Sequence, residues 1–112
     1  MKLLSRLDEL LLNCIIRLED NAYTFMISEK LQEITGRKWA FGAIFTSLDR
    51  LERKKYIKSF LGDETPERGG RRKRFYKIAP VGLKALAEIR QIDKSMWEDL
   101  PEIHIIDSKS DL

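Results

Sequence analysis

The sequence predicts a mainly helical fold with a small β-ribbon: three short helices come first, two strands follow, and a longer helix comes last. Apolar residues recur at the helical period in four separate stretches. Two short runs rich in β-forming residues flank a segment that contains a proline and two adjacent glycines. The length of 112 residues suits one domain with a single core.

The first helix is expected from Ser5 to Leu18, because one face carries apolar side chains at helical spacing: Leu7, Leu10, Leu11, Cys14, Ile15 and Leu18. Ser5 is the expected N-cap, and Asp8 and Glu9 suit the positive end of the helix dipole in the first turn. Cys14 is the single cysteine. Its place on the apolar face predicts a buried structural thiol and not a nucleophile.

Two further helices are expected over 24–35 and from Phe41 to about Lys54. Thr24 is the expected cap of the former, and Gly36 stands where a left-handed C-cap residue belongs. The latter presents Ile44, Leu48 and Leu51 to the core, with Phe45 beside them. Its opposite face is polar near the start and cationic near the end, with Thr46, Ser47, Arg50, Arg53 and Lys54.

The strands are expected over 56–61 and 74–78, with a mobile loop between them. Pro80 opens the last helix, whose broad apolar side consists of Val81, Ala85, Leu86, Ile89, Ile92, Met96, Trp97 and Leu100. Docking on one small domain requires a narrower stripe, so we expect part of this side to pack on a second copy of the chain. A helix that lies deep in its own core is the alternative.

The positive charge is concentrated in the middle of the chain. Residues 37–77 hold thirteen basic and five acidic side chains, a net charge of +8, although the whole chain carries only +3. After Trp97 acidic residues dominate. A concentrated positive middle is typical of a nucleic-acid binder, and an ordinary solvated charged surface is the alternative.

Enzymatic chemistry has no support in the sequence, which contains no phosphate-binding loop, nucleophile elbow or zinc-ligand spacing. His104 is the only histidine and lies in the expected tail. We therefore predict a protein that is not an enzyme and uses no cofactor or metal. No apolar run approaches the length of a membrane span, and a cytoplasmic location is expected.

The order of elements is that of a winged helix-turn-helix, and the third helix is the candidate recognition helix. A helix fits the major groove, so Arg50 is expected to pair with a guanine, and Thr46 and Ser47 to contact phosphates or bases. The loop between the strands contains Gly69, Gly70 and four consecutive cations, which predict phosphate binding. The predicted DNA-binding residues are Lys38, Ala43, Thr46, Ser47, Arg50, Arg53, Arg71, Arg72, Lys73 and Arg74.

Five stretches together resemble the PadR family of bacterial regulators: 21–23 (NAY), 31–36 (LQEITG), 42–52 (GAIFTSLDRLE), 62–73 (GDETPERGGRRK) and 76–82 (YKIAPVG). The resemblance covers Leu11 to Ile89. It implies a winged-helix homodimer that binds a palindromic operator, usually represses, and dimerises through its C-terminal helix. Several relatives respond to aromatic or amphipathic small molecules, so the resemblance also implies an effector.

Two residues depart from the family pattern. Phe45 stands where the family usually has tyrosine, so a phenolic contact to phosphate is lost. Lys55 stands where a glycine usually ends the recognition helix. A lysine there either adopts a left-handed backbone at some energetic cost or shifts the end of the helix.

We divide the chain into a winged helix-turn-helix domain over 1–79, a C-terminal dimerisation helix over 80–100 and an acidic, loosely ordered tail over 101–112. The expected dimer contacts are Leu7, Leu11, Leu86, Ile89, Ile92, Met96 and Trp97, and Trp97 is also the candidate ligand-binding residue. The predicted function is a sequence-specific DNA-binding regulator whose partners are double-stranded DNA, a second copy and a small-molecule effector. The alternative is a protein-interaction module that uses the same faces without specific DNA binding.

Overall fold

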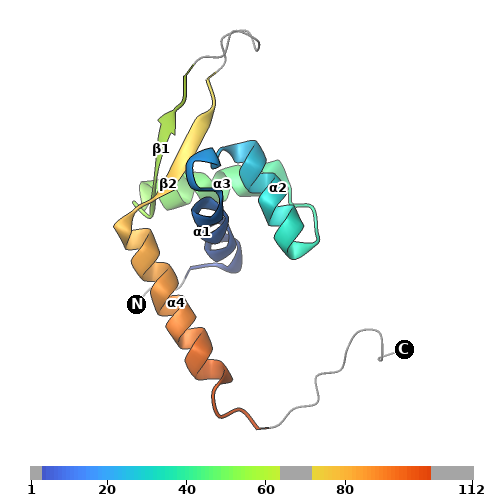
Figure 1. The fold of residues 1–112 in the computed structure, drawn as a ribbon, viewed down its shortest axis with the longest axis vertical. Coiled ribbons are helices and arrows are strands. Elements are labelled where there is room, and N and C mark those ends of the chain that lie inside the picture. The colour runs from blue at the N-terminus through green and yellow to red at the C-terminus, as the bar shows by residue number, and fades with distance from the viewer. Residues whose placement is uncertain (1–3, 64–71, 102–112) are drawn as a thin grey trace, which may run out of the picture.

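The structure is a computed structural model that describes residues 4–63 and 72–101. Its elements in chain order are α1 (Arg6–Leu18), the single turn η1 (Glu19–Asn21), α2 (Thr24–Thr35), α3 (Phe41–Arg53), β1 (Ile57–Leu61), β2 (Arg74–Ile78) and α4 (Pro80–Trp97) (Figure 1). The mainly helical fold with a small β-ribbon is confirmed. The long last helix begins at Pro80, as predicted, with the proline in its first turn.

Two of the three helix caps predicted at Ser5, Gly36 and Thr24 are confirmed. The Ser5 hydroxyl accepts a hydrogen bond from the Asp8 backbone N–H at 3.1 Å and so caps α1. Gly36 ends α2 with a left-handed φ of 72°. The expected cap at Thr24 is wrong: Thr24 is already helical, and Tyr23 is the cap without a side-chain bond. Tyr23 is held extended because it pairs with Phe75 in β2.

The end of α3 shows which of the two alternatives for Lys55 applies. Lys55 adopts a left-handed backbone with φ of 67°. Its N–H donates to the Glu52 carbonyl at 2.9 Å, and the Tyr56 N–H donates to the Leu51 carbonyl at 2.9 Å. These two bonds form a Schellman motif, which usually has glycine at this position. The backbone of a lysine here is strained by about 1–2 kcal/mol.

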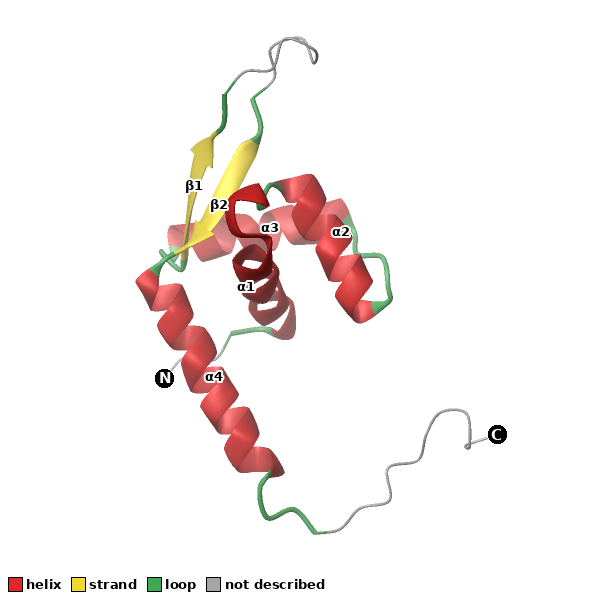
Figure 2. Cartoon of the chain, viewed as in Figure 1, coloured by secondary structure: helices red, strands yellow, loops and turns green. Residues whose placement is uncertain are grey.

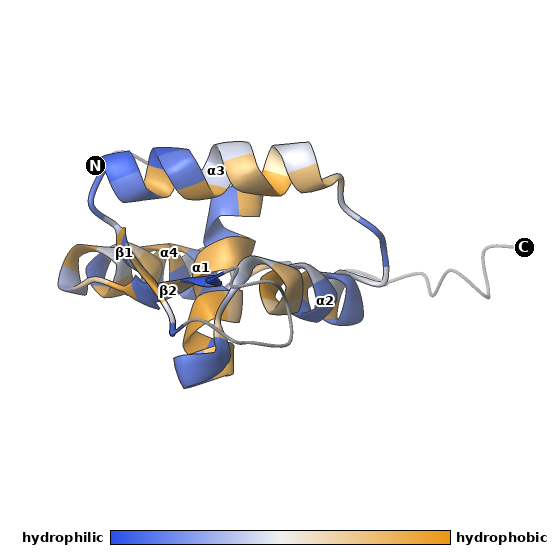
Figure 3. Ribbon diagram, turned by 90° about the horizontal axis from the view of Figure 1, so that it is seen from above, coloured by the Kyte–Doolittle hydropathy of each residue, from blue (hydrophilic) through white to orange (hydrophobic). Residues whose placement is uncertain are grey.

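The core lies where α1, α2, α3 and the base of the ribbon meet. Its fully buried side chains are Leu11, Leu12, Cys14, Ile27, Leu31, Ile44, Leu48, Leu51 and Ile57. The prediction that Cys14 is buried is therefore confirmed. Seen from above, α3 lies along one side of the molecule, with the other helices on its inner side (Figure 3). One long face of α3 is thereby left outside the core.

The ribbon is a two-stranded antiparallel sheet in which Ile57 pairs with Ile78 at its base and Leu61 pairs with Arg74 at its upper end. The Tyr76 N–H donates to the Ala22 carbonyl at 2.8 Å, which ties β2 to the connection between α1 and α2. The connection between the two strands, drawn in grey in Figure 2, lies outside the described residues over 64–71. The expected mobile loop therefore falls mostly outside them, as does most of the acidic tail.

Helix α4 leaves the base of the ribbon and passes α1 (Figure 1). Gly82 is buried where α4 crosses the chain at Tyr56, and a Cβ on Gly82 would collide with the Tyr56 carbonyl oxygen. Leu86 packs against the core, whereas Met96 and Trp97 at the far end are 67% and 66% exposed. None of the helices in the described part of the chain is long and apolar enough to cross a membrane.

Candidate nucleic-acid interface

The outer side of α3 carries part of the predicted DNA-binding set. Ala43, Thr46 and Arg53 are exposed, because Ile44, Leu48 and Leu51 turn the opposite side of the helix into the core. Lys38 is exposed in the turn that precedes α3. The structure therefore brings these four side chains to one helix and the turn before it, accessible to a second molecule.

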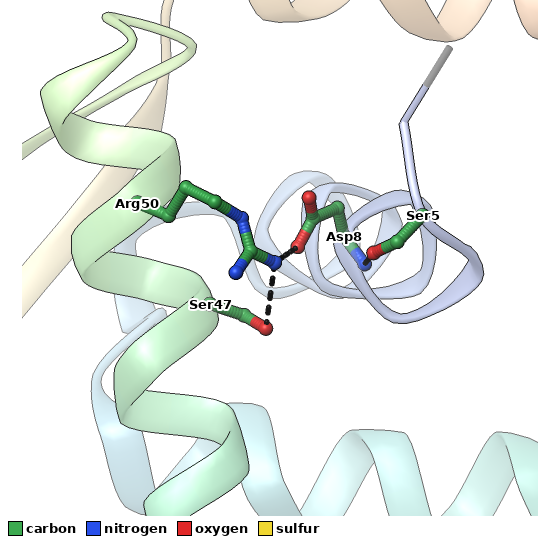
Figure 4. Close-up of polar contacts among 4 residues, drawn as sticks. All are labelled: Ser5, Asp8, Ser47 and Arg50. Carbon is green, nitrogen blue, oxygen red and sulfur yellow. Dashed lines mark hydrogen bonds and ion pairs between the residues drawn. The ribbon is translucent and has the colours of Figure 1, made fainter.

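Arg50 and Ser47 lie differently, because both face α1 (Figure 4). Arg50 Nη2 donates to Asp8 Oδ1 at 2.6 Å and to Ser47 Oγ at 3.3 Å. Ser47 is only 4% exposed and Asp8 only 5%. Neither Ser47 nor the bonded edge of the Arg50 guanidinium is presented outward in the way that the expected base and phosphate contacts require.

The Arg50 contact follows from the burial of Asp8. A carboxylate removed from water is costly unless a cation and hydrogen bonds compensate it, and Arg50 supplies both. A signal for this pair exists in the sequence: Asp8 lies three and four residues before Leu11 and Leu12, on the stripe that α1 buries. Sequence reasoning assigned Asp8 to the helix dipole and missed the partner 42 residues away.

The cations at the upper end of the β1–β2 ribbon, which forms the wing, are held in defined positions. Arg72 Nε donates to the Gly62 carbonyl at 2.7 Å, and both Arg72 and Arg74 are exposed. Lys73 is half-buried, with Nζ 4.3 Å from the centroid of the Tyr23 ring. All three cations lie at or just before the start of β2. Arg71, the remaining predicted wing residue, lies outside the described residues.

A polar chain connects the wing to the recognition helix. Arg74 Nη1 donates to Ser59 Oγ at 2.9 Å, and Ser59 Oγ donates to Glu52 Oε2 at 2.5 Å. Glu52 belongs to α3, Ser59 to β1 and Arg74 to β2. The orientation of the ribbon relative to α3 is therefore fixed by side chains as well as by the core. The local sequence contains no signal for this series of hydrogen bonds, since it depends on the strand register.

Two aromatic residues of α3 are exposed although the sequence groups Phe45 with the core residues. Phe41 is 48% and Phe45 is 47% exposed, and their ring centroids lie 6.2 Å apart. The spacing of four residues puts the two rings on neighbouring turns, beside the buried stripe and not on it. That offset is visible in the sequence and is the signal that could have found this pair.

The turn between α2 and α3 is stabilised by Trp39. Its Nε1 donates to Thr35 Oγ1 at 3.0 Å, and the Arg37 guanidinium lies 4.5 Å from the centroid of the Trp39 ring. The stacking fixes the position of the Arg37 guanidinium. With Lys38, Arg37 places two cations before the N-terminus of α3. The helix dipole adds to their positive field and favours a phosphate there.

The predicted dimer residues fall into three groups. Leu11 is fully buried in the protomer, so its side chain is not accessible to a second copy. Leu7, Leu86, Ile89 and Ile92 are partly buried along α1 and α4. Met96 and Trp97 are mostly exposed. A groove of about 560 Å³ separates α1 from α4, and its lining includes Leu10, Leu83 and Arg90.

The surroundings of Cys14 make its thiol unreactive. Burial raises the pKa of its thiol to about 11, against the smaller opposing effects of Arg17 and Lys30. The thiol is protonated at neutral pH, and a thiol is a poor nucleophile compared with a thiolate. No group of histidine, cysteine, aspartate or glutamate residues suited to a metal occurs within residues 4–63 and 72–101.

Comparison with known proteins identifies the family. The model of the transcriptional regulator PadR-like family matches residues 11–88, which run from within α1 through α2, α3 and the ribbon to the first half of α4. The chain belongs to the PadR family. It is therefore a winged-helix, DNA-binding transcriptional regulator by family. No curated protein matches the sequence significantly.

Solved PadR-like structures have the same fold. A transcriptional regulator from Clostridium thermocellum is 26% identical with a TM-score of 0.65, over 86% of this chain and 90% of that one. A PadR-like transcriptional regulator from Bacillus cereus is 26% identical with a TM-score of 0.66, over 80% and 82%. A PadR family regulator from Clostridium difficile is 28% identical with a TM-score of 0.64, over 82% and 95%.

Proposed function

We propose that this PadR-family protein is a cytoplasmic repressor of transcription that binds a palindromic operator as a homodimer. The observation that carries the proposal is the exposed side of α3, where Ala43, Thr46 and Arg53 stand outside the core beside the cationic wing. A helix in this position fits the major groove, and Thr46 lies in its first half, which approaches base edges. Ser47 is left out of the proposed contacts because it is buried.

Arg50 has a different role in this proposal. Its bond to Asp8 makes it a positioning residue, which fixes the angle of α3 against α1. Discrimination between sequences then depends on the outward side chains of α3 and not on the Arg50 guanidinium. Loss of Arg50 should weaken binding to every duplex, because the whole helix is displaced.

The wing supplies phosphate contacts. Arg72 and Arg74 are exposed at the upper end of β2, and their intramolecular bonds pre-orient them and leave other guanidinium N–H groups to donate. Lys73 and Arg71 continue the basic run. Contacts to phosphate carry no sequence information, so these residues contribute affinity that decreases with salt.

The proposed dimer interface is the apolar side of α4. Met96 and Trp97 are too exposed for ordinary packing, and Leu86, Ile89 and Ile92 continue the same side toward α1. A second copy of α4 in the groove beside α1 would bury them, and a twofold axis places two recognition helices on one side. Trp97 also borders a surface depression with Arg90, Asp93 and Lys94, which suits an aromatic or amphipathic molecule as effector.

The test is fluorescence anisotropy with a labelled duplex from upstream of the protein's own gene and a random duplex, each at several salt concentrations. Tight binding to the upstream duplex with two protomers per duplex is expected. Arg72→Ala should weaken binding to both duplexes and reduce the salt slope by about one unit. Equal, weak binding of the wild-type protein to both duplexes would overturn the proposal.

A further inference from the structure

Phe41 and Phe45 form an aromatic pair that no core element covers. They are 48% and 47% exposed, and their ring centroids are 6.2 Å apart on neighbouring turns at the start of α3. A single exposed aromatic ring is ordinary on a protein surface. Two adjacent rings form an apolar patch, and a second molecule that covers the patch gains the free energy of burying both rings. The patch belongs to the half of α3 that approaches the DNA in the proposed function.

The charges around the pair indicate what covers it. Lys38 is exposed three residues before Phe41, and Arg53 is exposed at the other end of the helix. Asp49 is exposed one turn after Phe45. A carboxylate is repelled by phosphates but accepts hydrogen bonds from the amino groups of bases. Lys38 before the helix and Arg53 at its end fit contacts to the DNA backbone, and the exposed side chains between them, from Phe41 to Asp49, fit base edges.

We propose that the Phe41–Phe45 pair contacts thymine C5-methyl groups in the major groove and so determines part of the sequence preference. The proposal rests on the proposed DNA-binding function. The thymine methyl is the apolar group that base edges offer in that groove. Phenylalanine has no hydrogen-bonding group, so the contribution of each ring comes from removing water from a methyl. The preferred operator therefore carries thymine at the positions that face the first two turns of α3.

The experiment starts with duplexes that the full-length protein selects from a randomised pool. Each selected duplex is then compared with a copy in which deoxyuridine replaces thymine in the half-sites, since deoxyuridine pairs in the same way and lacks only the methyl. The wild-type protein should bind the deoxyuridine copy about fourfold more weakly for each contacted methyl, as expected for one buried apolar carbon. Phe41→Ala or Phe45→Ala should bring the ratio at its methyl close to one.

Two control variants distinguish a contact to the thymine methyl from a contact to phosphate. Lys38→Ala should weaken binding to the thymine and deoxyuridine duplexes equally and keep the thymine preference, because a contact to phosphate does not depend on the methyl group. Phe45→Leu should keep part of the preference, because it retains an apolar side chain. Circular dichroism and thermal unfolding verify that each variant is folded.

Three results overturn the inference. Selected duplexes without conserved thymine do so, as does a thymine preference that persists in both alanine variants. A change of oligomeric state in Phe45→Ala, with the thymine preference intact, assigns the pair to a protein contact instead. Absence of any selected sequence refutes the proposed function itself, which is a distinguishable failure.

Discussion

The ion pair between Asp8 and Arg50 makes a quantitative prediction about how α3 is held. The 2.6 Å contact joins α3, the proposed DNA-binding helix, to α1, which borders α4. Replacing Arg50 by alanine leaves the Asp8 carboxylate buried without its cation, whereas replacing Asp8 leaves an arginine that can turn toward solvent. The two single variants should therefore destabilise the fold unequally, and the loss should be greater for Arg50→Ala.

The magnitude follows from the burial of the two side chains. A fully buried pair that loses one partner costs about 3–5 kcal/mol, and an exposed pair contributes less than about 1 kcal/mol. The Asp8 side chain is 7% exposed and that of Arg50 is 34% exposed, so this pair lies between the limits. We expect a loss of about 3 kcal/mol for Arg50→Ala and about 2 kcal/mol for Asp8→Ala, as for hydrogen bonds between charged groups. The double variant should lose about 1–2 kcal/mol less than the sum.

The assay is urea unfolding followed by circular dichroism for the wild type, the two single variants and the double variant. All four are compared at one protein concentration, since dimerisation would make stability concentration-dependent. The control is the surface pair of Lys30 and Glu33, joined at 3.2 Å, in which the Glu33 side chain is 70% exposed. Its coupling energy should be no more than about 0.5 kcal/mol.

Two results would refute the reasoning. A coupling energy for Asp8 and Arg50 no larger than that of the control pair would mean that the contact does not hold α3. An Arg50→Ala variant of wild-type stability that loses only its discrimination between DNA sequences would assign Arg50 to base contact. Under the positioning role, by contrast, binding to specific and random duplexes decreases together.

Three further predictions test the local geometry. Lys55→Gly should raise the free energy of unfolding by about 1 kcal/mol, because glycine adopts the left-handed backbone without strain; an unchanged urea midpoint would contradict this. Gly82→Ala should lower it by about 1–3 kcal/mol through its collision with the Tyr56 carbonyl, whereas Gly42→Ala, which has open space, should raise it by about 0.5–1 kcal/mol; equal midpoints would exclude the collision. The Cys14 thiol should react slowly with Ellman's reagent until urea is added. Because its folded pKa of about 11 lies above the unfolded value, stability should fall as the pH rises from about 8.5 toward 11. Cys14→Ala should make that fall smaller, and the part that remains includes the contribution of Tyr76, whose pKa is also raised by burial.

The secondary structure was accessible from the sequence because its causes are local. Apolar spacing predicts α1, α2 and α3, and Ser5, Gly36 and Pro80 mark helix ends by their own backbone or hydrogen-bonding chemistry. The exception is Thr24, whose capping role is excluded by the pairing of the preceding Tyr23 with β2. That pairing joins residues more than fifty positions apart, so nothing in the local sequence shows it.

The candidate site also has features that depend on the local sequence and features that depend on tertiary packing. The sequence by itself determined the order of elements, the concentration of cations in the middle of the chain and the helix that faces outward, because these depend on composition and periodicity. Only the tertiary structure decided which side chains of α3 are accessible: it turned Ser47 inward, joined Arg50 to Asp8 and left Phe41 and Phe45 exposed. The physical reason is that accessibility depends on which elements pack beside α3, and the burial of one distant carboxylate was enough to redirect Arg50.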